Sequence, residues 1–423
     1  MTRRWRTALL VALTGALSAA LPAQAQEAAD DLIHSRPTGA FALTPDWGLE
    51  ATAASLQTAV GTTTSVAALL RDANRDLASC NSAQQQALPE NYSRTDYPLT
   101  SGQILHSNEK YCWDPGDSKV DYWIPQGVTG SADADDDGLW GENRILLVSW
   151  HYDDAAPDKG VRISFVDLKN RKYRHVLLVE PTANANYKAV PIHAGGLAWL
   201  GHYLYVADTD GGLRVFDVER LLEVSDAQDS IGKSGSTYYA HNYKYVLPQV
   251  GWYRQNVRID CVPSASQLCF SSLSLDRSTT PDTLVVGEYR DGRSTDTAVD
   301  GGRVVRYRVD ASSRQLVLTD GKAVPQDVVT VPRGNLQGVQ TWEDRYYLGR
   351  SSNRNHSWMH SGSVGGATET KSWAIGGEDL YHEHGTGITA GKLWTVTEHA
   401  WSEDGGTFID RRAIFAVPLS SIG

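Results

Sequence analysis

The sequence predicts an all-β fold: a β-propeller of five blades, with six as the alternative, and a short helical N-terminal segment packed on it. Two observations predict this fold. Short apolar runs with alternating polar residues recur along residues 118–423, and turn residues separate them. These runs group in threes and fours, and four-stranded units repeated every several tens of residues are typical of propeller blades.

The chain starts with the features of a cleaved secretory signal. Residues 1–25 hold early arginines, an apolar run and a final Ala-Gln-Ala, with cleavage expected after Ala25. The apolar run is short and rich in alanine and glycine, and no later segment approaches the length of a membrane span. We therefore expect a secreted protein, extracellular or periplasmic, without a membrane span.

Residues 26–117 form an N-terminal extension that differs from the rest of the chain. Over 49–80, leucine, valine and alanine recur with helical spacing, which predicts one or two helices. One helix pair cannot bury a core alone, so we expect it to pack on an edge of the propeller rather than to form a separate domain. Near the end of the extension, SGQILHSNEKYC (101–112) is a candidate strand.

The clearest repeat is HAGGLAWLGHYLYVADTDGGLRVFDV, residues 193–218, in which three alternating apolar runs are broken by glycine, aspartate and histidine. That pattern is typical of three antiparallel strands with tight turns. Similar units have the first strands PQGVTGS, FSSLSLD, LQGVQTW and GEDLYHE. Fourth strands are expected in RHVLLVEP, YKYVLPQ, RQLVLTD and TKSWAIG. The last unit runs out of chain after its third strand, so we expect residues 101–112 to supply its fourth strand and close the ring.

The four cysteines suit structural disulfides in an oxidising compartment. Sequence alone allows three pairings. The short loop between Cys261 and Cys269 favours that pair, which leaves Cys80 and Cys112 to hold the N-terminal region. A cysteine-based metal site would need tighter spacing than this.

The net charge argues against one class of partner. The formal charge of the whole chain is -11, and loss of Arg3, Arg4 and Arg6 with the signal would leave about -14. An acidic protein repels phosphate backbones, so nucleic acid is not expected as a partner. We expect a monomer whose partner is a polysaccharide or another extracellular glycan.

The first strand of each blade is expected to start at the mouth of the central channel. Aligning these starts groups polar residues there, with His193 and Asp379 beside them: Gln126, Gly195, Ser271, Gln337 and Glu378. Such a ring could bind water, a substrate or a cation, or it could satisfy the exposed backbone. If a divalent cation such as calcium binds at the mouth, its predicted ligands are Gln126, His193, Gln337 and Glu378.

Aligning the ends of the second strands groups further residues on the same face: Trp150, Asp208, Glu288, Arg350 and Glu398. Carboxylates gathered in a cleft tend to have perturbed pKa values. The predicted catalytic residues are Glu288, Glu398, His399, Tyr289 and Arg350. The predicted substrate-binding residues are Trp150, His151, Arg290, Trp401 and Asp208. Structural roles are the alternative, above all for Asp208, whose side chain can cap its own turn.

Two polar stretches are expected on the opposite face, because each joins a first strand to a second strand. In YHEHGTG (381–387), His382 and His384 lack a third and a fourth ligand, which favours a polar turn over a metal site. The loop DADDDG, from Asp133 to Gly138, could hold calcium, although it lacks the downstream acidic ligand of an EF-hand.

These residues support three hypotheses for function. The first is a secreted carbohydrate-active enzyme that cleaves a polysaccharide at the mouth face, by hydrolysis with two carboxyls or by β-elimination with arginine, histidine and tyrosine. The second is a carbohydrate-binding or adhesive propeller without chemistry, and the third is a metal-dependent lactonase or esterase. The chain lacks GxSxG, a P-loop and a helix-opening GxGxxG, so a nucleophile elbow and nucleotide cofactors are unsupported.

The stretches QGVTGSAD, KGVRISFVD, YRHVLLVEP and HAGGLAWLGHYLYVADT resemble secreted bacterial β-propeller proteins of uncharacterised function. The resemblance covers roughly residues 110–423. It implies a propeller and implies no activity.

Overall fold

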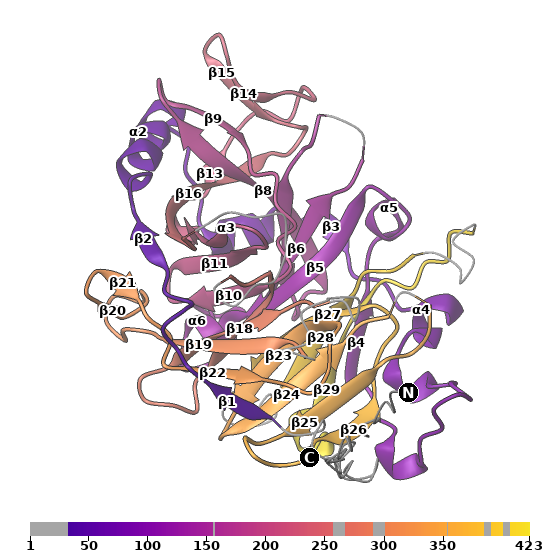
Figure 1. The fold of residues 1–423 in the computed structure, drawn as a ribbon. Helices are drawn as coiled ribbons and strands as arrows, with labels where there is room; N and C mark the ends of the chain where they lie inside the picture. The colour runs from indigo at the N-terminus through magenta and orange to yellow at the C-terminus, as the bar shows by residue number, and fades with distance from the viewer. Residues whose placement is uncertain are drawn as a thin grey trace, which may run out of the picture.

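The computed structural model describes residues 33–154, 157–256, 267–290, 301–352, 354–384, 391–400 and 407–423. The predicted signal peptide lies outside these residues. Within the described part of the chain, the strands form five four-stranded units whose first strands contact one another at the centre (Figure 1). The chain is therefore an all-β propeller with five blades, which confirms the fold that the repeat predicts.

The blades follow one another along the chain, and each runs from the centre outward. Blade 1 contains β5 (Trp123–Gly130), β6 (Ile145–Tyr152), β7 (Val161–Asp167) and β8 (Lys172–Thr182). Blade 2 contains β10 (Leu197–Leu200), β11 (Tyr203–Asp208), β12 (Gly212–Asp217) and β16 (Tyr245–Arg254). Blade 3 contains β17 (Phe270–Asp276), β18 (Thr283–Glu288), β19 (Arg303–Arg308) and β22 (Asp327–Thr330). Blade 4 contains β23 (Leu336–Trp342), β24 (Arg345–Arg350), β25 (Trp358–Gly362) and β26 (Glu369–Ser372). Blade 5 contains β27 (Gly377–Glu383), β28 (Lys392–Thr397), β29 (Ala413–Pro418) and β4 (Glu109–Cys112).

Blade 3 differs from its prediction in one strand. The sequence predicts RQLVLTD as the fourth strand, but β22 pairs with β19 in that place. The predicted run instead enters a small hairpin of β20 (Leu318–Thr319) and β21 (Lys322–Ala323). The turn of this hairpin holds Asp320 at φ 50° and Gly321 at φ 76°. Two successive residues in the left-handed region make a tight turn, and this turn interrupts the predicted strand.

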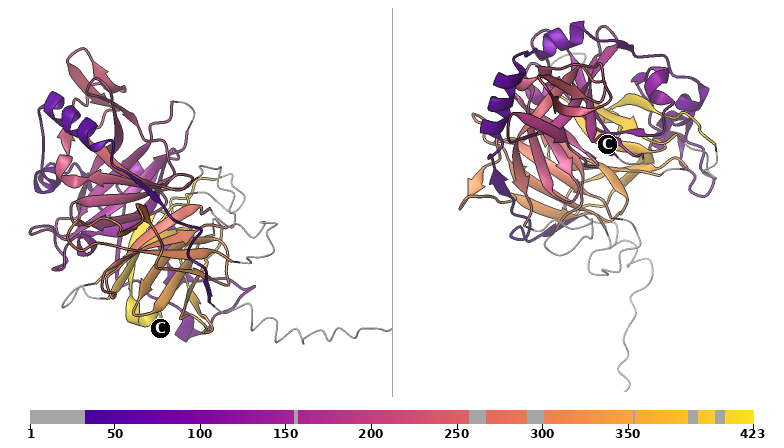
Figure 2. Two further views of the ribbon diagram at one scale, coloured as in Figure 1. Left: turned by 60° about the vertical axis from the view of Figure 1, so that its left-hand side comes forward. Right: turned by 90° about the horizontal axis from the view of Figure 1, so that it is seen from above.

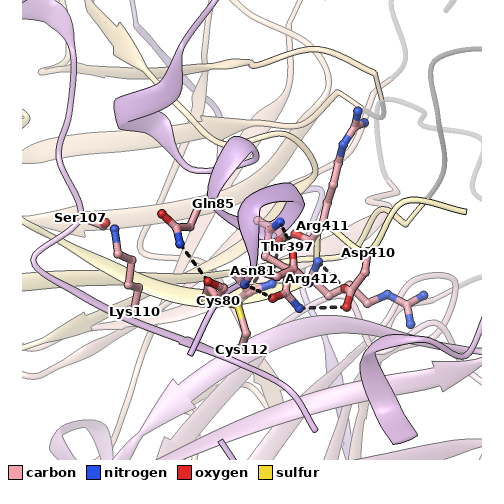
Figure 3. The surroundings of a disulfide bond; sticks show 12 residues. Cys80, Asn81, Gln85, Ser107, Lys110, Cys112, Thr397, Asp410, Arg411 and Arg412 are labelled. Atoms are coloured by element: carbon pink, nitrogen blue, oxygen red, sulfur yellow. Dashed lines mark hydrogen bonds between the residues drawn. A yellow bond between two sulfur atoms is a disulfide. The ribbon is translucent and has the colours of Figure 1, made fainter. Parts of the chain in front are cut away.

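A strand from the N-terminal extension closes the ring. β4 lies inside the predicted stretch 101–112 and pairs antiparallel with β29 of blade 5. The disulfide between Cys80 and Cys112 ties β4 to an earlier part of the extension (Figure 3). This pairing confirms one of the two predicted disulfides. Cys269 is also disulfide-bonded, and Cys261, its predicted partner, lies outside the described residues.

The helices of the extension lie where the sequence predicts them. Ser65 caps α3 (Val66–Arg71) by accepting a hydrogen bond from the backbone N–H of Ala68 at 3.2 Å. This helix and α2 (Glu50–Val60) contact the outer strands of blades 1 and 2 (Figures 1 and 2). Their buried residues join the propeller's own hydrophobic clusters. The extension therefore covers an edge of the propeller and does not build a separate core.

The remaining short elements lie outside the four-stranded units. Those of the extension are β1 (His34–Arg36), β2 (Thr44–Asp46), β3 (Arg75–Asp76), α4 (Ser82–Gln86) and α5 (Pro115–Ser118). Those between blade strands are α6 (Ser131–Ala134), β9 (Asn186–Ala189), β13 (Leu222–Glu223), β14 (Ile231–Ser234) and β15 (Thr237–Ala240). Every helix in the described ranges is too short or too polar to cross a membrane.

The centre of the propeller is held by one buried carboxylate. Asp379, in β27, accepts hydrogen bonds from the backbone N–H groups of Val128 at 2.9 Å, Leu197 at 3.0 Å and Leu273 at 3.0 Å. These donors belong to the first strands of blades 1, 2 and 3, so one side chain joins four blades. Its φ of 46° belongs to the left-handed region, which aspartate tolerates better than most residues.

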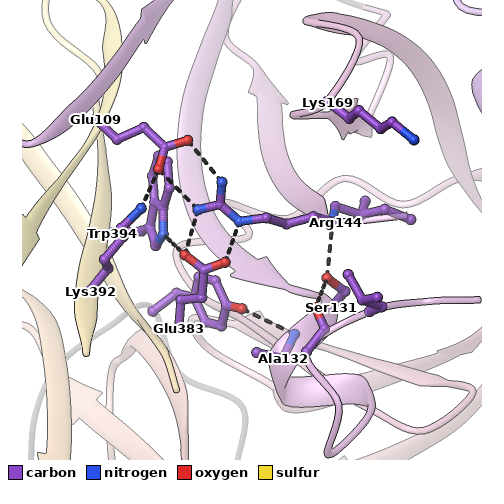
Figure 4. Close-up of polar contacts among 12 residues, drawn as sticks. Glu109, Ser131, Ala132, Arg144, Lys169, Glu383, Lys392 and Trp394 are labelled. Carbon is purple, nitrogen blue, oxygen red and sulfur yellow. Dashed lines mark hydrogen bonds and ion pairs between the residues drawn. The ribbon is translucent and has the colours of Figure 1, made fainter. Parts of the chain in front are cut away.

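A second network joins blade 5 to blade 1 near the rim (Figure 4). The Arg144 guanidinium donates to Glu383 at 2.5 Å and 2.6 Å and to Glu109 at 2.9 Å and 3.0 Å. Lys392 adds a contact of 2.6 Å to Glu109, and the Trp394 indole donates to Glu383 at 2.9 Å. The network links β4, β27 and β28 to the turn before β6, where the ring closes.

Candidate active site

The mouth of the channel owes its shape to β-bulges. The first strands of blades 1, 3, 4 and 5 each carry a register shift near the mouth. A bulge inserts unpaired residues and redirects their side chains. Gln126, Ser271 and Gln337 occupy three of these bulges, and Asp379 occupies the fourth. The bulges in the backbone therefore explain why the predicted polar ring forms at the starts of the first strands.

Two adjoining cavities lie on this face and share Tyr289 and Gln337 in their walls. The larger, of about 610 Å³, extends over blades 1 to 4, and its other polar lining residues include His151, His193, Asp208, Asp210 and Ser271. The smaller, of about 470 Å³, extends over blades 3 to 5 and is lined by Arg94, Asn335, Arg350, Ser351, Ser352, Trp358, Glu398 and His399. Many of the predicted site residues thus gather at one place.

Glu398 is the most strongly held ionised group of the smaller cavity. Its Oε1 lies 2.9 Å from His399 Nε2, and its Oε2 accepts a hydrogen bond of 2.6 Å from the Gln126 side-chain amide. Burial opposes ionisation, but the hydrogen bonds that Glu398 accepts from His399 and Gln126 outweigh it and lower the pKa of Glu398. Because Glu398 Oε1 faces Nε2, we place the His399 proton on Nε2, which leaves Nδ1 with a lone pair.

Glu378 lies directly against Glu398 and is buried. The Ser351 hydroxyl and Glu398 are its hydrogen-bonding neighbours. Burial and the Glu398 charge raise the pKa of Glu378 well above its usual value. Two carboxylates in contact cannot both ionise, so Glu378 is the protonated member of the pair and can donate to Glu398.

Two neutral histidines border this pair on the side of the larger cavity. The ring centroids of His151 and His193 are 4.4 Å apart. Burial lowers the pKa of His151 to about 3, with a smaller contribution from His193. Burial also lowers the pKa of His193, although the charge of Glu398 favours its protonation. Both rings are therefore neutral at neutral pH, and each offers one hydrogen-bond donor and one acceptor.

The structure places three of the predicted residues inside blades. Trp150 is fully buried, and its indole donates to Ser164 Oγ at 2.8 Å. Glu288 is fully buried and accepts a hydrogen bond of 2.6 Å from Arg303 Nε, while Arg290 Nε lies 3.8 Å from the same carboxylate. These three residues do not line either cavity.

Two further predicted substrate-binding residues have separate outcomes. Asp208 lines the larger cavity, but its Oδ2 accepts a hydrogen bond of 2.9 Å from Arg214 Nε, so it is already paired. Trp401 lies outside the described residues.

The predicted metal ligands Gln126, His193, Gln337 and Glu378 surround the mouth. Among the described residues, however, three metal-ligating side chains converge at one other place: His202, Asp217 and Glu219. The metal site at the mouth stays a prediction.

The described parts of the two polar stretches predicted for the opposite face lie there, at the far ends of β5 and β27, and residues 385–387 of the second stretch lie outside the described residues. His382 is buried, and its ring contacts Trp342 with centroids 4.3 Å apart, while Glu383 points away to Arg144. In the Asp133–Gly138 loop, the carbonyl oxygens of Ala132 and Asp133 accept hydrogen bonds from Arg277 at 2.9 Å and 3.2 Å. Calcium at this loop stays a prediction.

Sequence reasoning missed the residues that complete the smaller cavity. Arg94 belongs to the extension, where no repeat points to it, and it pairs with Asp96. Trp358 starts the third strand of blade 4 and therefore belongs to neither aligned column. The repeat in the sequence shows that Trp358 belongs to a blade. Its exposure to the cavity, however, depends on how the extension packs against blade 4.

The comparisons with known proteins identify a likeness of fold only. No family model matches the sequence, and no curated protein matches it either. Solved structures that resemble it include a luciferin-regenerating enzyme, at 9% identity, covering 70% of this chain and 92% of that chain with a TM-score of 0.30. A GH43_1 enzyme from Xanthomonas citri complexed with xylose has 11% identity over 71% of this chain and 88% of that chain, with a TM-score of 0.31. A levansucrase variant from B. subtilis has 8% identity over 84% of this chain and 92% of that chain, with a TM-score of 0.35. Values this low carry no argument about function.

Proposed function

We propose that the protein is a carbohydrate-active enzyme that cleaves a polysaccharide at the channel mouth, with His399 as general base and Glu398 as the group that orients it. The observation that carries the proposal is the contact of 2.9 Å between His399 Nε2 and Glu398 Oε1 in the wall of the smaller cavity. A carboxylate that accepts from one ring nitrogen fixes the tautomer and leaves the other nitrogen able to take a proton.

Hydrolysis by two carboxyl groups fits this geometry less well. That mechanism needs carboxyl groups about 5–10 Å apart on either side of the bond. Glu378 is buried in contact with Glu398, and Glu288 and Asp208 are paired with arginines. The Glu378–Glu398 pair is therefore better suited to holding a charge next to His399 than to flanking a sugar.

Two other groups have the chemistry to assist the base. Tyr289 lines both cavities, and its hydroxyl can exchange a proton with an oxygen of the substrate. Gln337 also faces both cavities and offers an amide for sugar hydroxyls. A polysaccharide that lies across the mouth would contact both cavities, since they share these two residues.

The test compares single variants on a panel of neutral and acidic polysaccharides. His399→Asn and Glu398→Gln should abolish product formation but retain binding, whereas His34→Asn, an exposed histidine of β1, should leave turnover unchanged. Binding by the wild type that Glu398→Gln weakens, with no product from the wild type or any variant, would identify a carbohydrate-binding propeller instead. Activity that disappears with a chelator would favour a metal-dependent lactonase or esterase.

A further inference from the structure

The smaller cavity contains a guanidinium that forms no ion pair within the described part of the chain. Arg350, at the end of β24, lines this cavity, and its Nε donates to the carbonyl oxygen of Gly334 at 3.0 Å. Within the described residues, no carboxylate lies within ion-pair distance of it, whereas Arg144, Arg214 and Arg303 each have one. Arg350 is only partly buried, and within the described residues its terminal nitrogens make no hydrogen bond or ion pair.

The surroundings of Arg350 add positive charge and an aromatic surface. Its guanidinium lies 5.2 Å from the Trp358 ring, and the Arg94 guanidinium lies 4.3 Å from the same ring. Burial lowers the pKa of Arg350, and so does its proximity to Arg333 and Arg94. A guanidinium in this setting is stabilised by an incoming anion, because no carboxylate of the described residues forms a direct ion pair with it.

The geometry points to a substrate that carries a carboxylate: we infer that Arg350 binds the carboxylate of a uronic acid residue in the polysaccharide. A guanidinium offers a planar fork that matches a carboxylate through two parallel hydrogen bonds. Trp358 and Asn335, in the same cavity, offer an aromatic face and an amide for the sugar that bears the carboxylate. This inference rests on the proposed function, because it names the substrate class of the same site.

A uronic acid in this position sets the reaction as β-elimination. His399 Nδ1 removes the proton from the carbon that bears the carboxylate, and Arg350 stabilises the negative charge that develops on the carboxylate. The electron pair of the broken C–H bond forms a double bond to the neighbouring carbon. The glycosidic C–O bond on that neighbour breaks, and the leaving oxygen takes a proton from the Tyr289 hydroxyl. The proton that His399 accepted returns to the tyrosine by exchange through water. No oxidant or further reactant is therefore consumed.

The experiment uses the purified full chain and four probes: a uronic acid polymer, its methyl ester, its carboxyl-reduced neutral form and a sulfated neutral glycan. Ultraviolet absorbance of unsaturated ends and reducing ends are measured together. We expect cleavage of the free acid with an unsaturated product, and Arg350→Gln should lower kcat/KM by about 100-fold or more. Arg350→Lys should recover part of it, and Arg308→Gln, an exposed arginine at the end of β19, should match the wild type.

Binding to His399→Asn separates this inference from the proposed function. This variant should bind the uronic acid polymer, and the double variant with Arg350→Gln should not, at an unchanged melting temperature. Cleavage of the neutral form, or a saturated product, would overturn the inference and leave the proposed function standing. Preference for the sulfated glycan would also overturn it. Absence of both cleavage and Arg350-dependent binding would overturn both.

Discussion

Asp379 should be the side chain on which the propeller's stability depends most. Its carboxylate accepts three backbone hydrogen bonds of 2.9 Å, 3.0 Å and 3.0 Å from three other blades. Asp379→Ala removes every acceptor at once and leaves these N–H groups buried at the centre. Alanine also tolerates the φ of 46° at this position less well than aspartate.

The magnitude follows from the number of donors. Each buried N–H that loses its acceptor costs about 1–3 kcal/mol, so the three together predict a loss of about 3–9 kcal/mol. A typical domain has only about 5–15 kcal/mol of stability in total. Asp379→Asn keeps one acceptor oxygen, which can serve two of the three donors because Oδ2 accepts from both Val128 and Leu197, and asparagine suits the same backbone conformation, so this variant should cost less.

Urea denaturation followed by tryptophan fluorescence measures this loss. The matched control is Asp226→Ala, because Asp226 is exposed and should change the free energy of unfolding by less than about 0.5 kcal/mol. An Asp379→Ala variant within about 1 kcal/mol of the wild type would refute the reasoning, since the three N–H groups would then have found other partners.

Three more predictions concern stability. Removing the Cys80–Cys112 disulfide, whose sequence separation is 32, should cost up to about 3–4 kcal/mol in urea denaturation, and unchanged stability would show that β4 stays paired without it. The pKa of Glu109 is about 2, because its cationic partners outweigh burial. The stability that ionised Glu109 contributes is therefore complete above its usual pKa and is lost as the pH falls toward 2. Arg144→Met should weaken this contribution and move acid unfolding to higher pH, and an unmoved midpoint of acid unfolding would contradict the pairing. The raised pKa of Glu378 has the opposite sign, because folding favours its protonated form and this stabilisation is lost as the pH rises. Glu378→Gln should therefore melt higher than the wild type at pH 8 and equally near pH 4, and a lower melting temperature at pH 8 would refute the assignment.

The N-terminal extension bears on both stability and the site. It supplies β4, which closes the ring, and it supplies Arg94 to the wall of the smaller cavity. Trp358 donates its indole N–H to the Tyr92 hydroxyl at 3.0 Å and packs against the Tyr97 ring with centroids 5.2 Å apart. The extension therefore positions the aromatic surface next to Arg350, and damage to it should affect binding as well as stability.

The sequence by itself determined most of the architecture. Alternation of apolar and polar residues and the turns between strands are local signals, and they located the first three strands of every blade. The closing strand was predicted by counting the strands of each blade, because the last blade lacked a fourth strand. The prediction of RQLVLTD as a fourth strand was wrong, and here too the deciding feature is local. Asp320 and Gly321 form the turn of a hairpin, and an Asp-Gly pair is a hairpin signal in the sequence itself.

Only the tertiary structure decided which polar residues meet. Trp150, Glu288 and Glu398 all belong to one aligned column, yet the first two point into their own blades and are buried there. Glu398 instead meets Gln126 from blade 1 and Glu378 from its own blade. The physical reason is that a strand pattern specifies which residues alternate, whereas the bulges, the twist of each blade and the packing of its neighbours decide where each side chain ends.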